Sequence, residues 1–142
     1  MYLDSAYIAK YYLNETDSHA VRAAIRTADS LTSSEWSVVE VACAFHRHMR
    51  QGELSARQFH DLMQVFLKHC EAGLWTLVPV GDRLLRRVSA SLGTLPAGIY
   101  LRAGDAVQLM SAQASGEREV WTSDRHMLAA APHFGLLGRT AS

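Results

Sequence analysis

Four acidic residues interrupt apolar or small-residue stretches in four separate parts of the sequence. Asp4 and Asp124 each come at the end of an expected strand. Glu40 is the only charged residue between positions 36 and 45, and Asp105 lies among small and apolar residues. Four carboxylates brought together repel one another unless a divalent cation is present, and Mg²⁺ and Mn²⁺ prefer such hard oxygen ligands. The set therefore indicates metal-dependent chemistry, in which the ion orients a phosphodiester and activates a water.

Each of these acids also has a structural explanation. Asp4 and Asp124 are able to cap the helices that follow them, which stabilises a helix by about 1 kcal/mol and is the simpler explanation for either residue alone. Asp105 suits the first turn of a helix, where the macrodipole favours negative charge. Glu40 is explained equally well by an ion pair with an arginine, since a buried unpaired charge is costly. The functional interpretation rests on the four together.

Strand and helix signals alternate along the chain. We expect strands at 1–3, 30–34, 75–80, 119–123 and 134–137, and helices at 5–13, 17–28, 35–51, 55–72, 82–92, 99–114 and 124–131. Ser34 and Ser55 are the expected N-caps of two of these helices. Strands separated by helices require right-handed crossovers, so we expect a mostly parallel sheet in a three-layer α/β/α sandwich.

The carboxyl ends of the strands are where an open parallel sheet binds ligands. Asp4 and Asp124 are expected at two of these strand ends. Glu40 and Asp105 are expected on helices that cover the same edge. The architecture thus predicts that the four acids converge there.

Composition favours one packed domain, residues 1–142, because 49% of the residues are hydrophobic and 20% are charged. The 14 basic and 14 acidic residues give a formal charge of zero, so no overall positive field attracts a polyanion. Most of the basic residues are arginines, however, and arginine suits phosphate oxygens. Arg102 and Arg125, next to the proposed acids, are the first candidates for RNA contact, followed by Arg86 and Arg87.

Cys43 and Cys70 lie far apart in apolar helical stretches, where we expect reduced thiols packed as small hydrophobic groups. The sequence opens without a basic region followed by a long apolar run, and no stretch approaches about 18 apolar residues. We expect a soluble, unexported, cytoplasmic protein with no membrane contact.

Four motifs resemble those of the PIN domain, and in particular those of the VapC toxins of bacterial type II toxin–antitoxin modules. They are Tyr2-Leu3-Asp4-Ser5-Ala6, Ser33-Ser34 with Val38-Val39-Glu40-Val41, Leu101-Arg102-Ala103-Gly104-Asp105-Ala106, and Val120-Trp121-Thr122-Ser123-Asp124. The sequence departs from the common pattern at Ala6, where many relatives carry a second Ser, and at Gln108, where many carry His.

This resemblance implies a five-stranded parallel sheet and a Mg²⁺- or Mn²⁺-dependent endoribonuclease that acts as a toxin on RNA, tRNA included. The implied roles are metal ligation by Asp4 and Asp105, a ligand or adjacent carboxylate in Glu40, water-mediated ligation or positioning of the nucleophile by Asp124, and hydrogen-bonding support from Ser5 and Thr122. It also implies a homodimer and a cognate antitoxin whose C-terminal segment covers the acidic site. An aromatic stripe of Tyr7, Tyr11 and Tyr12 is a candidate lining for the antitoxin groove, although core packing is the favoured explanation for Tyr7 and Ile8.

Other kinds of site fit the sequence less well. His46 and His48 point to different faces of a helix, so we expect the histidines to be surface or interfacial residues rather than metal ligands. Haloacid-dehalogenase phosphatases need a second Asp at the position of Ala6. The rival that remains is a PIN-like module that binds RNA or a protein without cleaving.

Overall fold

The computed structural model describes residues 1–141 and contains a five-stranded sheet in which all strands are parallel. The strands are β1 (Tyr2–Leu3), β2 (Thr32–Ser34), β3 (Thr76–Val78), β4 (Glu119–Trp121) and β5 (Leu137–Arg139). Their order across the sheet is β3-β2-β1-β4-β5, with β1 at the centre. The expected parallel, five-stranded sheet is confirmed.

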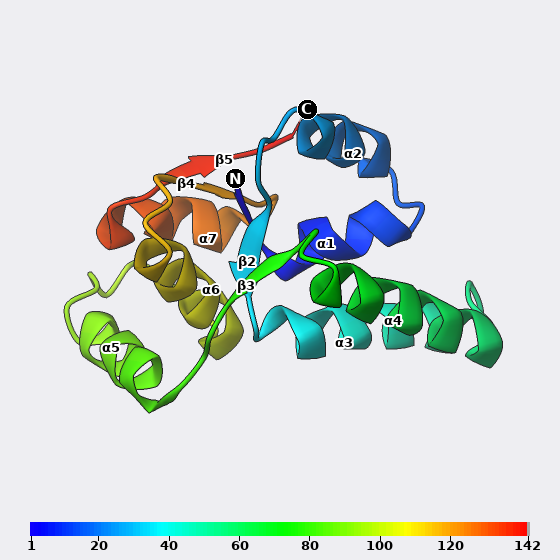
Figure 1. Ribbon diagram of the computed structural model, residues 1–142. Helices are drawn as coiled ribbons and strands as arrows, with labels where there is room; N and C mark the ends of the chain where they lie inside the picture. Colours follow the sequence, from blue (N-terminus) through cyan, green and yellow to red (C-terminus); the bar gives the residue numbers. More distant parts are fainter. Residues whose placement is uncertain (142) are drawn as a thin grey trace.

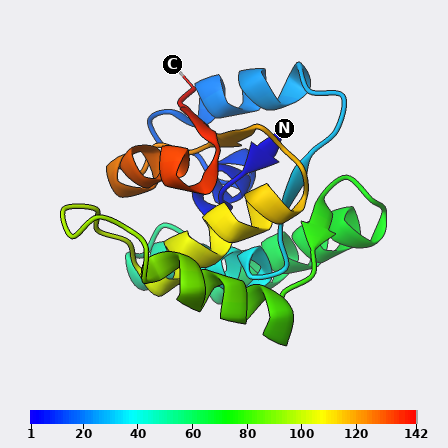
Figure 2. The ribbon, with the colours of Figure 1, turned by 90° about the vertical axis from the view of Figure 1, so that its left-hand side faces the viewer.

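Helices cover both faces of the sheet (Figure 1). They are α1 (Ser5–Tyr12), α2 (Ser18–Arg26), α3 (Ser37–Arg50), α4 (Ala56–Glu71), α5 (Asp82–Leu92), α6 (Ala103–Ala114), α7 (Arg125–Ala130) and the 3₁₀ helix η1 (Ala131–Phe134). The first four pack on one face and the others on the opposite face, where α5 and α6 lie nearest the viewer in Figure 2. The three-layer α/β/α sandwich is confirmed.

Two hydrophobic cores lie on either side of the sheet, and β1 contributes to both. Tyr2 is buried with residues of α5, α6, α7 and η1, whereas its neighbour Leu3 is buried with residues of α1 to α4. Successive side chains of a strand point to opposite faces, so two adjacent apolar residues serve two cores. A short apolar strand is therefore what a central position requires.

The strand order places a reversal of direction beside β1. The chain first runs from β1 to β2 and β3, then crosses the sheet through α5 and α6 to place β4 on the other side of β1. Strands β1 and β4 pair with Tyr2 opposite Val120. The Asp4 amide, just after β1, donates to the Trp121 carbonyl at 3.1 Å. The segments after β1 and β4 then diverge, which opens the sheet edge for a ligand.

Several element boundaries differ from the sequence-based expectation. The helix expected at 99–114 begins only at Ala103, because Arg102 has extended backbone angles. The strand expected at 134–137 is displaced: Phe134 ends η1, Gly135 takes a left-handed φ of 69°, and the strand occupies Leu137–Arg139. The Ser34 hydroxyl accepts from the Trp36 amide, so the helix expected from 35 starts at residue 37.

Two expectations about side-chain burial are wrong. Cys43 is exposed, because it lies on the side of α3 that borders a cavity, although Cys70 is half-buried as expected. His48 is buried rather than superficial, with its two ring nitrogens against Glu15 and Glu53. The burial of polar residues in a helix depends on neighbours that are distant in the chain.

The aromatic stripe of α1 belongs mostly to the core. Tyr7 and Ile8 are fully buried, as the core-packing explanation predicts. Tyr11 and Tyr12 are half-buried and pack against Trp75 with ring centroids 5.5 and 6.4 Å away. Within residues 1–141, no helix combines the length and apolarity needed to cross a bilayer.

Candidate active site

Asp4 follows β1 and is held by two hydrogen bonds. Its Oδ1 accepts from the Tyr7 amide at 2.8 Å, which makes Asp4 the N-cap of α1. Its Oδ2 accepts from the Thr122 hydroxyl at 2.5 Å. The side chain is 4% exposed, so the capping explanation holds, but it leaves a carboxylate buried at the sheet edge.

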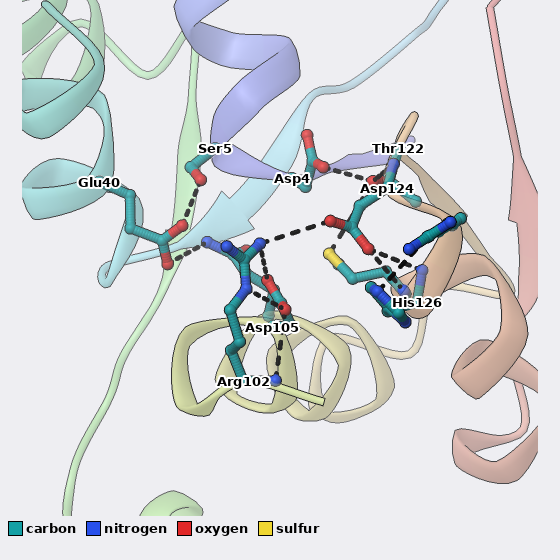
Figure 3. A network of polar contacts seen from close by, with 11 residues as sticks. Asp4, Ser5, Glu40, Arg102, Asp105, Thr122, Asp124 and His126 are labelled. Carbon is teal, nitrogen blue, oxygen red and sulfur yellow. Dashed lines mark hydrogen bonds and ion pairs between the residues drawn. The ribbon is translucent and has the colours of Figure 1, made fainter. Parts of the chain in front are cut away.

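Asp124 follows β4 and is tied to Asp4 through Thr122. The Thr122 hydroxyl that donates to Asp4 also accepts from the Asp124 amide at 2.9 Å. Asp124 Oδ1 caps α7 by accepting from the amides of His126 and Met127 at 2.8 and 3.0 Å. This leaves Asp124 Oδ2 directed toward the cavity, where Arg102 reaches it (Figure 3).

Asp105 lies in the first turn of α6 and forms an ion pair with Arg102. Arg102 Nε donates to Asp105 Oδ2 at 3.0 Å, and Nη2 of the same guanidinium lies 3.4 Å from Asp124 Oδ2. Figure 3 shows the guanidinium on the Glu40 side of these two carboxylates, with dashed contacts to both. One arginine therefore serves as the counter-charge for two acids that are 19 residues apart in sequence.

Glu40 faces the same space from α3. Its Oε2 accepts from the Ser5 hydroxyl at 2.5 Å, and its Oε1 accepts from the Gln108 amide at 3.4 Å. The salt bridge to an arginine that would explain Glu40 structurally is absent from residues 1–141, where its partners are neutral. Glu40 is thus a half-buried carboxylate with hydrogen bonds and no paired cation.

The four acids line one cavity of about 480 Å³ at the carboxyl edge of the sheet. Within the described residues, however, no three side chains of the His, Cys, Asp and Glu types lie close enough to hold a single ion. Each acid is already engaged: Arg102 pairs with Asp105 and Asp124, while Asp4 and Glu40 accept from hydroxyl groups (Figure 3). The structure brings the acids to one cavity without clustering them as ligands.

The electrostatics of the cavity favour an added cation. Burial raises the pKa of the Asp4 carboxyl from 3.8 to about 6, and the charge on Glu40 adds to the rise. Burial likewise raises the pKa of Glu40, with a further contribution from the charge on Asp105. Carboxylates that repel one another and offer only oxygen atoms are the donor set that Mg²⁺ and Mn²⁺ prefer, so the residues present fit such an ion.

The candidate arginines are not equally placed. Arg102 lines the cavity, and its side chain is 63% exposed. Arg125 is exposed at the start of α7, next to Asp124. Arg86 and Arg87 lie on α5, where they bond to Asp82 and Gln113, and neither lines the cavity. Of these four, Arg102 lines the cavity and Arg125 adjoins Asp124, so both remain candidates for contact with a ligand at the acids. Arg47, which the sequence did not single out, also lines the cavity.

Two other cavity-lining residues had no assigned role in the sequence. Gln108 is 1% exposed and accepts from the Tyr2 hydroxyl at 2.7 Å while donating to Ser37 at 2.9 Å and to Glu40. The signal was present, because Gln108 is a polar residue one helical turn after Asp105 in an apolar helix. Trp36 lines the cavity opposite Gly104 and carries no such signal in the sequence.

Comparisons with known proteins agree with this architecture. The family model described as PIN domain matches residues 1–132. No curated protein matches the chain. Among solved structures, the chain is similar to Mycobacterium tuberculosis VapC20, described as a sarcin-ricin loop cleaving toxin, with a TM-score of 0.69 over 91% of this chain and 93% of that chain. The identity is 12%, so this likeness concerns the fold.

Proposed function

The chain belongs to the PIN-domain family, and from this premise we propose that it is a metal-dependent endoribonuclease that acts as the toxin of a toxin–antitoxin pair. The observation that carries the proposal is the convergence of Asp4, Glu40, Asp105 and Asp124, from four separate segments, on one cavity at the carboxyl edge of the sheet. The VapC toxin of similar fold supports the same assignment.

Asp4 and Asp105 would hold Mg²⁺ or Mn²⁺, with Glu40 and Asp124 as further ligands or as acceptors for its bound water. The ion supplies a polarised phosphate oxygen and a more acidic water. Thr122 holds the Asp4 and Asp124 segments at a fixed separation, since its hydroxyl bonds to both. Ser5 orients Glu40 in the same way.

Arg102 and Arg125 would bind RNA phosphates on the open side of the cavity. With Asp105 and Asp124 engaged by a bound ion, the Arg102 guanidinium would be available for a phosphate, because those two acids would no longer need it as their counter-charge. Neutralising Arg102 is expected to weaken RNA binding and to lower its dependence on log salt concentration by about one unit. An unchanged affinity and slope in Arg102→Gln would contradict this role.

We further propose a cognate antitoxin that covers the acidic cavity, a homodimer and a cytoplasmic location where RNA is the substrate. Dimerisation is checked by light scattering after gel filtration, which distinguishes the 15.7 kDa chain from twice that mass. Because Tyr11 and Tyr12 are half-buried, their replacement by Ser is a poor test of antitoxin binding, and exposed cavity residues are better probes.

The deciding experiment compares the wild type with Asp105→Asn on labelled tRNA and on a sarcin-ricin loop hairpin. Each protein is assayed with Mg²⁺, with Mn²⁺ and with EDTA. We expect metal-dependent cleavage by the wild type only, with 5′-phosphate and 3′-hydroxyl products. Thermal unfolding supplies a second readout, because an ion that binds the folded state raises the Tm of the wild type more than that of the variant.

Two results would contradict the nuclease assignment. Equal cleavage by both proteins indicates a contaminating ribonuclease. RNA binding without cleavage by either protein, on both substrates and with both ions, favours the binding module that does not cut RNA.

A further inference from the structure

An aromatic ring with an exposed face lies in the wall of the acidic cavity. Trp36 is 38% exposed, whereas Trp75 is 1% exposed in the core. A Cβ added to Gly104 would lie 3.2 Å from Trp36 Nε1 and 3.0 Å from Glu40 Oε1, so the indole edge and this carboxylate meet at one glycine. That glycine immediately precedes Asp105. The ring therefore lies directly beside the proposed reaction centre.

The backbone that carries this ring is firmly held. The Glu35 amide donates to the Val78 carbonyl at 2.9 Å, and the Glu35 carboxylate accepts from the Val80 amide at 3.0 Å. The Trp36 amide itself donates to the Ser34 hydroxyl at 3.1 Å. These bonds fix the turn between β2 and α3 against the chain after β3. An exposed indole on such a support loses little conformational freedom when it packs against a ligand.

A second exposed aromatic residue lies on the other side of Arg102. Tyr100 is 58% exposed and packs edge-on against His126, with ring centroids 5.0 Å apart. His126 belongs to α7, whereas Glu40 and Trp36 belong to the α3 side of the cavity. Figure 3 shows Glu40 and His126 on opposite sides, with Arg102 between them. The acids thus have Trp36 in the cavity wall on the α3 side and, just outside the cavity, the Tyr100–His126 pair on the α7 side.

We propose that Trp36 and the Tyr100–His126 pair stack against nucleobases on the two sides of the acids and so hold the unpaired nucleotides of the RNA at the cleavage site. This inference rests on the proposed function and specifies which residues contact the bases. A base within an A-form helix is stacked on both faces, whereas a base in a loop exposes its faces to aromatic side chains. A chain with a formal charge of zero attracts phosphates weakly, so stacking supplies affinity that charge does not.

The test measures RNA affinity by fluorescence anisotropy with Asp105→Asn, so that RNA is not consumed. The probes are a labelled hairpin with an unpaired loop and a fully paired duplex of the same length. We expect tighter binding of the hairpin. Adding Trp36→Ala weakens hairpin binding by about 5- to 150-fold, the range for loss of one stacked base, and leaves duplex binding unchanged.

Three matched variants separate stacking from other causes. Trp36→Phe retains an aromatic face and is expected to retain most of the affinity. Tyr100→Ala weakens hairpin binding, whereas Leu85→Ala, which removes an exposed apolar side chain of α5 outside the cavity, does not. Trp36→Ala leaves the salt dependence unchanged, because stacking releases no counterions. Circular dichroism checks that each variant is folded.

The inference is overturned by equal affinity for hairpin and duplex, by no measurable affinity for either, or by equal effects of Trp36→Phe and Trp36→Ala. Loss of antitoxin binding without loss of RNA affinity would assign the ring to the protein partner instead. The wild-type cleavage assay is read separately. Cleavage that is insensitive to Trp36→Ala refutes stacking and leaves the nuclease assignment intact. RNA binding that depends on Trp36 but is not followed by cleavage supports stacking and contradicts the nuclease assignment.

Discussion

Acidic residues border a cavity at each end of the sheet, with volumes of about 480 Å³ at the carboxyl ends of the strands and about 500 Å³ at the amino ends. At the amino ends, two of the three acids that line the cavity have their own cation, and the third acid is Asp29. Glu117 lies 3.0 Å from the Met1 ammonium, and Glu119 lies 2.8 Å from Arg139. At the carboxyl ends, Asp105 and Asp124 share the guanidinium of Arg102, whereas Asp4 and Glu40 have hydrogen-bond partners and no ion pair within residues 1–141.

This difference shows which acids serve the fold and which remain available for a ligand. Ion pairs at the amino ends neutralise charge locally and contribute little else, as partly exposed pairs usually do. The carboxyl ends retain negative charge in a partly buried space, which raises the free energy of the folded state. A site that tolerates this cost without a structural benefit is a candidate for function.

The largest expected effect comes from removing one charge at each end. Asp4→Asn is expected to lower RNA cleavage by at least about 100-fold, because even residues that only orient metal ligands contribute about 10- to 100-fold. Glu117→Gln at the amino end leaves cleavage unchanged. Initial rates on the same labelled RNA measure both. Similar rates for the two variants would remove the functional distinction between the ends.

The next effect concerns stability and pH. In the folded protein the pKa of Asp4 is about 6, above its value of 3.8 without burial, so ionisation of Asp4 destabilises the fold. The free energy of unfolding is highest below about pH 4, where Asp4 is protonated in both the folded and the unfolded protein. It declines as the pH rises through about 6. In Asp4→Asn the group cannot ionise, although Asn is still a good N-cap.

Without metal, Asp4→Asn is therefore expected to exceed the wild type in stability by about 3 kcal/mol above pH 7, with the difference vanishing toward pH 4. Urea unfolding in EDTA at several pH values measures this. If the difference in stability between the two proteins stays constant across the pH range, burial does not raise the pKa of Asp4.

A smaller effect is expected from a methyl group placed inside the acidic cavity. In Gly104→Ala the added Cβ lies 3.0 Å from Glu40 Oε1 and 3.2 Å from Trp36 Nε1, so both side chains must shift. We expect cleavage to fall by up to about tenfold, since the required shift is a few tenths of an ångström and a displacement of about 1 Å at a reaction centre costs about 100-fold. Gly98→Ala, at an exposed position with no atom within 4 Å of the new Cβ, is the matched control. Equal rates for the two variants would place Glu40 and Trp36 outside the reaction.

The smallest effect is expected at the amino ends. Glu119→Gln removes the ion pair with Arg139, whose side chain is 48% exposed, and should lower the free energy of unfolding by less than about 1 kcal/mol. Thermal and urea unfolding measure the change. A loss as large as that from a buried group would mean that this exposed ion pair stabilises the fold far more than such pairs usually do.

Much of the fold was predictable because its signals are local. Short apolar runs bounded by polar residues predicted the strands, and Gly52 and Gly73, which have φ of 78° and 80°, mark the ends of two helices. The errors fell where tertiary contacts compete with local preference, as in the late start of α6 at Ala103 and the displaced strand β5 at Leu137–Arg139. Boundaries of this kind depend on which backbone groups find partners across the sheet.

The sequence by itself determined the α/β class and the identity of the four acids, because periodicity and residue type need no knowledge of distant neighbours. Only the tertiary structure decided which hydrogen-bond and ion-pair partners each of these acids has. Asp4 meets Thr122 across 118 positions of sequence, and Glu40 meets Gln108 across 68. Contacts between segments that are distant in sequence also let Arg102 pair with two carboxylates. They likewise place the exposed Trp36 beside Glu40. Burial and pairing are properties of surroundings, and only the folded chain creates those surroundings.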